Sequence, residues 1–134
     1  MNILQGNITK ITTDGQLSLV KLTSHGCALT TVVVDTPVTS PYLKINDPVN
    51  ILFKETEVIL ARPFSENISL TNKIPCTVRS VLCEGLLCKV AMDFNGVTIH
   101  ALLTHEAWDS LDMAAADEVV AMINTIEVSL SGHA

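Results

Sequence analysis

Four cysteines and four histidines are the side chains of this sequence best suited to metal or redox chemistry. The cysteines are Cys27, Cys76, Cys83 and Cys88, and the nearest two, Cys83 and Cys88, stand on either side of an expected turn. They form no C-x-x-C pair, whereas structural zinc sites usually take more tightly paired ligands. We therefore expect free, buried cysteines that pack as small apolar side chains in a reducing compartment.

The histidines give no ligand pattern either. They are His25, His100, His105 and His133, and only His100 and His105 are near each other in the sequence. Their spacing of five residues across a strand end is poor for chelation by two imidazoles. The sequence thus predicts no metal site and no cofactor.

Catalytic motifs are also missing from the sequence. It contains no nucleophile elbow, no Gly-rich phosphate loop and no paired carboxylates in an evident cleft. We therefore expect a protein that is not an enzyme.

The charge of the chain limits its partners. Fourteen Asp and Glu residues against eight Lys and Arg residues give a net charge of −6, and no cationic cluster occurs. Electrostatic binding to nucleic acid or to anionic lipid is not expected. The first residues do not resemble a signal peptide, and no apolar run approaches the roughly 20 residues of a membrane span. We expect a soluble, cytoplasmic protein.

The chain repeats itself without a gap at an offset of 70 residues. Glycines and apolar runs recur in the same order, and identical residues meet at several positions. The matched residues of the first copy are Asn2, Gly15, Leu17, Val20, Gly26, Ser40, Asp47, Val49, Glu57, Val58 and Leu60. The sequence therefore predicts two modules, 1–66 and 67–134.

Modules of this size lie near the lower limit for independent folding. Hydrophobic residues make up 48% of the chain and charged residues only 16%. Two separate small modules cannot bury that much apolar surface, so we expect a homo-oligomer.

Each copy has the pattern of five short strands and one short helix. In the first copy Asp14-Gly15 predicts a hairpin, and Thr36-Pro37 predicts the start of the helix. The expected strands are 7–12, 16–22, 28–34, 49–53 and 58–61 in the first copy, and 77–81, 86–92, 97–104, 118–124 and 128–130 in the second. The predicted fold class is all-β, with two tandem OB-like five-stranded barrels, each with one short helix.

One segment of the second copy has two interpretations. Residues 105–124 contain no Gly or Pro and, taken alone, predict one long helix. The matching segment of the first copy contains Pro37, Pro41 and Pro48, which do not fit inside a continuous helix. We therefore expect a short helix that ends near Leu111 and a strand from about Glu118.

Several short motifs resemble the molybdate-binding Mop, or TOBE, domain. They are Ser69-Leu70-Thr71-Asn72, the hairpin around Gly85, the strand end Ala101-Leu102-Leu103-Thr104, and the stretch from Leu111 to Val119. The first copy resembles a more diverged example. A free-standing tandem pair is similar to the cytoplasmic di-Mop molbindins, whose modules form trimers and hold molybdate or tungstate at module interfaces.

The resemblance implies an oxyanion site formed by Ser69, Asn72 and Thr104 of the second copy and Lys54 of the first. Hydroxyls, a lysine and backbone N–H groups can bind such an anion even in an acidic protein. The implied function is molybdate or tungstate binding for storage or homeostasis by a homotrimer.

The chain also departs from the family pattern. Thr71 stands where the family has arginine, Ala107 and Pro37 stand where it has serine, and Asn124 replaces the second lysine. Two alternatives therefore stay open. One is a degenerate tandem module that has lost anion binding and acts in oligomerisation or regulation, and the other is a binder of a different small anion or metabolite.

Overall fold

The computed structural model describes residues 1–64 and 67–132, and within them it contains ten strands, one α-helix and two 3-10 helices. The elements of the first repeat are β1 (Asn2–Asp14), β2 (Leu17–Ser24), β3 (Cys27–Val33), β4 (Pro48–Phe53), η1 (Glu55–Glu57) and β5 (Ile59–Ala61). Those of the second are β6 (Asn72–Glu84), β7 (Leu87–Phe94), β8 (Val97–Thr104), α1 (His105–Leu111), β9 (Glu118–Ile123), η2 (Thr125–Glu127) and β10 (Ser129–Gly132). The end of the first predicted module at residue 66 and His133 lie outside the described residues.

The strands form two antiparallel five-stranded sheets, in the orders β10-β4-β1-β2-β3 and β5-β9-β6-β7-β8. Alternate residues of each strand point inward, as β1 shows with Leu4 and Ile8 and β6 with Ile74 and Val78. The buried apolar side chains of both repeats form one contiguous cluster. The predicted all-β fold of two tandem OB-like units is confirmed.

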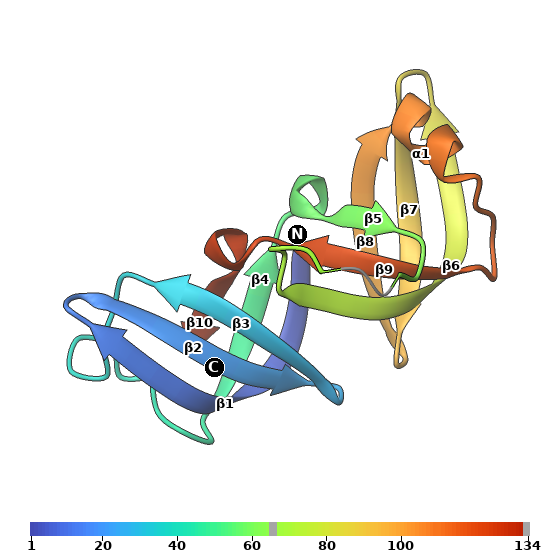
Figure 1. Cartoon of the computed structure of the whole chain (residues 1–134). Coiled ribbons are helices and arrows are strands. Elements are labelled where there is room, and N and C mark those ends of the chain that lie inside the picture. The colour runs from blue at the N-terminus through green and yellow to red at the C-terminus, as the bar shows by residue number, and fades with distance from the viewer. Residues whose placement is uncertain (65–66, 133–134) are drawn as a thin grey trace.

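The two repeats exchange their last strands. The strand β5 of the first repeat pairs with β9, and β10 of the second repeat pairs with β4. Figure 1 shows the green β5 beside the red β9, and the dark red β10 among the strands of the first repeat. Neither repeat alone holds a complete sheet, so the division into 1–66 and 67–134 stays a prediction based on the sequence repeat.

Tight turns connect the hairpins at the predicted glycines. Asn95 (φ 47°) and Gly96 (φ 91°) join β7 to β8, and His25 and Gly26 do the same between β2 and β3. Two successive positive φ angles are typical of the type I′ turn, whose twist matches that of the flanking strands. The turn tips also touch, because the Asn95 side chain donates a hydrogen bond to the His25 carbonyl (2.7 Å).

The segment with two interpretations follows the repeat. Helix α1 covers His105–Leu111, and β9 begins at Glu118. The αL conformation of Asp112 (φ 50°) ends the helix. No helix within the described residues reaches the length and apolar character that a membrane crossing requires.

The helix expected after Thr36 in the first repeat is wrong. The Thr36 carbonyl accepts hydrogen bonds from the N–H groups of Thr39 (3.0 Å) and Ser40 (2.9 Å), and the chain makes no further helical turn. Pro41 has no N–H to donate and disfavours the helical conformation of Ser40. A single turn therefore stands where the second repeat has α1.

Two equivalent asparagines fasten each repeat to the other. The Asn72 side chain accepts a hydrogen bond from the Thr30 N–H (2.7 Å) and donates one to the Thr30 carbonyl (2.8 Å). Asn2 pairs in the same way with His100, at 2.8 and 2.9 Å. Both asparagines are buried, so each side-chain amide replaces a strand partner at a sheet edge.

We predict that Asn72→Ala lowers the free energy of unfolding by about 2 kcal/mol or more, because it leaves backbone polar groups of Thr30 without partners. Asn2→Ala has a comparable effect through His100. Urea unfolding measures both, with the exposed Asn7→Ala as the control. Equal unfolding midpoints for Asn72→Ala and Asn7→Ala would contradict this role.

Candidate functional site

Lys54 lies at the junction between the repeats, immediately before η1. Its side chain is exposed, and its backbone N–H donates to Glu57 Oε1 (2.8 Å). A cavity of about 350 Å³ opens beside it. The cavity is lined by Met1, Leu52, Phe53, Lys54, Glu57, Ile126, Glu127 and Ser129. Both repeats therefore contribute to the surroundings of Lys54.

Two carboxylates, Glu57 and Glu127, meet in this cavity, and they occupy equivalent positions of the two repeats. A hydrogen bond with Glu57 raises the pKa of Glu127, and desolvation and the negative charge of Glu57 raise it further. One lysine thus faces two acidic groups. This balance opposes an anion at the cavity unless the two carboxyls share a proton.

Thr104 ends β8 and is the N-cap of α1. Its Oγ1 accepts a hydrogen bond from the Ala107 N–H (3.1 Å), so the hydroxyl stabilises the first turn of the helix. Ala107 stands where the family has a serine, and the cap therefore offers one hydroxyl rather than two. Thr104 remains exposed.

Ser69 and Asn72 differ in their freedom to reach a ligand. Ser69 is exposed in a bend before β6, whereas Asn72 is 1% exposed and holds Thr30 with both ends of its side-chain amide. Thr71, at the family's arginine position, places its hydroxyl 3.0 Å from that of Thr125. The position of Asn72 is thus explained by the contact between the repeats.

The strand exchange brings the carriers of these residues to the same sheet. The helix η1, which follows Lys54, packs against β8, which ends at Thr104, and β6 begins at Asn72. Among the described residues, however, no hydrogen bond or ion pair directly joins two of the four predicted ligands. Their elements converge, and their polar groups bind neighbouring parts of the fold.

Two of the cysteines are not free, contrary to the sequence prediction. Cys83 and Cys88 form a disulfide across the β6–β7 hairpin, with their Cα atoms 4.0 Å apart. The register of this hairpin places them directly opposite each other, so their side chains lie on one face. Cys27 and Cys76 are free.

The sequence analysis also missed a cluster that includes this disulfide. One ring nitrogen of His105 and the sulfurs of Cys83 and Cys88 all lie within 4.8 Å of one another. His105 was considered only as a partner of His100, whose backbone is instead held by Asn2. The hairpin register, read together with the start of α1, was the signal that could have found the cluster.

Comparisons with known proteins agree with this architecture. The family model described as the TOBE domain matches residues 68–130. These residues form a TOBE domain. The resemblance of the tandem chain to the Mop/TOBE family is confirmed.

Two curated relatives are the molybdenum import ATP-binding proteins ModC of Brucella abortus (strain 2308) and Brucella suis biovar 1 (strain 1330). Each is 33% identical to this TOBE chain over 87 residues, which cover 64% of the chain and 24% of ModC. The matched region therefore spans about a quarter of the length of ModC.

A solved structure extends the likeness to both repeats. The cytoplasmic molybdate-binding protein ModG, with molybdate bound, superposes with a TM-score of 0.91 at 21% identity. The match covers 98% of this chain and 96% of that chain. The two chains therefore share the tandem fold.

We predict that Glu127→Gln raises the urea midpoint at pH 7 and has a smaller effect at pH 4. A carboxyl whose pKa is raised on folding contributes stability at low pH and loses it as the pH rises through the folded-state pKa. The glutamine keeps the neutral form at both pH values. Glu84→Gln, an exposed acid at the end of β6, is the control. An equal effect of Glu127→Gln at both pH values would refute the coupling with Glu57.

Proposed function

We propose that this protein binds a tetrahedral oxyanion, molybdate or tungstate, reversibly and without catalysis, and that it serves in storage or homeostasis in the cytoplasm. The observation that carries the proposal is the likeness of the whole chain to the molybdate-binding protein ModG. The ModC relatives, named for molybdenum import, support the same ligand class. Anion binding is compatible with the acidic chain because local donors, rather than net charge, form such a site.

The proposed ligands are Ser69, Asn72, Thr104 and Lys54, placed where modules meet. Lys54 is the one cation of this set, and its exposed side chain has room to turn toward the end of β8. Because η1 packs on β8, an anion near Thr104 is within the sheet that receives the closing strand of the first repeat. The role of Asn72 is to position the start of β6, and an anion would meet this backbone rather than a free amide.

We further propose that the protein is a homotrimer. Large apolar side chains remain exposed on the outer faces of the hairpins, among them Leu17, Leu82 and Leu87. Such side chains favour a subunit interface that covers them. A site between modules of neighbouring chains would also gain donors that one chain does not supply.

A second function, loss of anion binding with retention of assembly, is favoured by the polar contacts of the predicted ligands. Asn72 is fully engaged with Thr30, and Lys54 shares its cavity with Glu57 and Glu127. Under this alternative the chain is an oligomerisation or regulatory module. Direct binding measurements distinguish the two functions.

We predict that the full chain gives binding heat with molybdate and tungstate in titration calorimetry and weaker heat with sulfate. Lys54→Ala lowers the affinity by about tenfold or more, because a hydrogen bond to a charged group contributes about 1.5–3 kcal/mol. Lys10→Ala is the matched control, because Lys10 is an exposed lysine roughly 25 Å along β1 from Asn2. No heat with any of the three anions would favour the second function, and equal affinities of the two variants would exclude Lys54 as a ligand.

We predict that light scattering after gel filtration gives a mass of three times the chain mass of 14.4 kDa, with or without molybdate. Leu17→Glu and Leu87→Glu place charges on the outer faces and lower this mass. A stable monomer of the unmodified protein would contradict both the trimer and sites between chains.

A further inference from the structure

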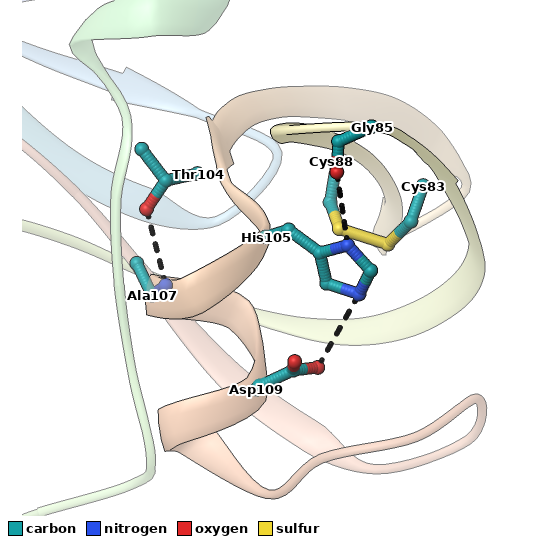
Figure 2. The surroundings of a disulfide bond; sticks show 7 residues. All are labelled: Cys83, Gly85, Cys88, Thr104, His105, Ala107 and Asp109. Carbon is teal, nitrogen blue, oxygen red and sulfur yellow. Dashed lines mark hydrogen bonds and ion pairs between the residues drawn. A yellow bond between two sulfur atoms is a disulfide. The ribbon is translucent and has the colours of Figure 1, made fainter.

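The cluster of Cys83, Cys88 and His105 lies at one end of the second sheet. Cys83 is near the end of β6, Cys88 is near the start of β7, and His105 is the first residue of α1. Figure 2 shows the imidazole facing the disulfide across the β6–β7 turn. Cys88 is fully buried, and the other two side chains are partly buried. The cluster therefore has one side in the core and one open to solvent.

Three contacts fix the position of His105. Its backbone N–H donates to the Leu86 carbonyl (2.8 Å), and its Nδ1 lies 3.1 Å from the Gly85 carbonyl. A carbonyl oxygen accepts hydrogen bonds only, so Nδ1 carries the proton and the neutral ring keeps a lone pair on Nε2. Metal-binding histidines show this arrangement, in which a backbone carbonyl orients the ring through the nitrogen that does not bind the metal.

Asp109 adds an oxygen donor to the same place. Its Oδ1 lies 3.6 Å from His105 Nε2, one helical turn further along α1 (Figure 2). The carboxylate is exposed and can rotate. A fourth ligand for a tetrahedral ion is therefore within reach, either from Asp109 or from water.

The first repeat shows that the fold does not require these residues. At the equivalent positions Thr13 Oγ1 and Ser18 Oγ form a hydrogen bond (3.1 Å) across the β1–β2 hairpin. Ser18 Oγ also donates to the carbonyl of Asp35, the counterpart of His105 (2.6 Å). Two hydroxyls thus join this hairpin in one repeat, whereas the other repeat has two sulfurs and an imidazole.

We propose that the reduced hairpin binds a Zn²⁺ ion through Cys83, Cys88 and His105, and that formation of the disulfide closes this site. Two thiolates and one imidazole are a ligand set that Zn²⁺ prefers, with the fourth position left to an oxygen donor. The site takes a cation through side chains other than the four proposed for the oxyanion, so it is independent of the proposed function.

Opening the site requires a reductant, and a dithiol supplies it. The Sγ–Sγ bond breaks, the two sulfurs gain two electrons and two protons, and the dithiol is oxidised to a disulfide. Zn²⁺ then displaces the two thiol protons, which pass to solvent. In tetrahedral coordination the sulfurs stand about 3.8 Å apart, as follows from Zn–S bonds of about 2.3 Å.

The test uses the full chain, reduced with a phosphine or left oxidised, and titrated with Zn²⁺ against a chromophoric chelator. We expect one Zn²⁺ per reduced chain and no binding at this site by the oxidised chain. Co²⁺ serves as a second probe, because coordination by thiolate gives a ligand-to-metal charge-transfer band. Two further thiols must appear on reduction, beyond those of Cys27 and Cys76.

The first repeat supplies the test variant. Cys83→Thr with Cys88→Ser installs the hydroxyl pair already present at Thr13 and Ser18, so the hairpin keeps a side-chain pair that this fold accommodates. We expect this variant to lose at least 100-fold in Zn²⁺ affinity. His105→Gln, which keeps a polar side chain at the helix start, loses at least tenfold, and Cys27→Ala, which changes a free cysteine, keeps the affinity of the parent.

Three results would overturn the proposal. They are the absence of stoichiometric Zn²⁺ binding by the reduced chain, unchanged affinity in His105→Gln, and a loss in Cys27→Ala as large as that in the double variant. Circular dichroism of each variant shows whether the fold is kept. If the double variant is unfolded, His105→Gln and the Co²⁺ band of the parent decide the question.

Discussion

The hydrogen bonds of the exchanged strands are the interaction on which the rest of the structure depends. Without β10, the edge of β4 would expose unpaired backbone groups, and without β5 the edge of β9 would do the same. Each repeat completes the sheet of the other, and the buried Val58 and Val128 anchor the crossing segments. The asparagine pairs at Thr30 and His100 act at the same junction. The two repeats are therefore one cooperative unit with a common core, although the sequence divides them evenly.

Local patterns and the repeat predicted most of the elements, because they depend on residues near one another in the chain. The glycine turns, the end of α1 near Leu111 and the start of β9 at Glu118 follow from turn chemistry and from the comparison of the copies. The helix after Thr36 was wrong because Pro41 prevents a second turn there. The partners of β5 and β10 were not predictable, since pairing inside a repeat and pairing between repeats use the same strand sequence.

The candidate site was predictable only at the level of motifs. Resemblance selected Ser69, Asn72, Thr104 and Lys54, but it gave no information on what their polar atoms bind in this fold. Asn72 is held by Thr30, 42 residues away in sequence, and Lys54 meets Glu127 through the exchange of strands. Contacts of this kind depend on tertiary structure. The Cys83–Cys88 pair is different, because the predicted hairpin around Gly85 already contained the register that opposes them.

Comparison of the two repeats separates the demands of the fold from the demands of chemistry. Both copies satisfy the same turns, strand pairings and core, so a residue that only the fold requires has a counterpart of similar chemistry, as Asn2 has in Asn72. Thr13 and Ser18 match Cys83 and Cys88 in position but not in chemistry, and Lys54 is matched by Asn124. The second repeat thus carries a set of soft ligands, and the first carries the lysine. This division fits a chain whose structural symmetry is close while its binding groups are distributed asymmetrically between the copies.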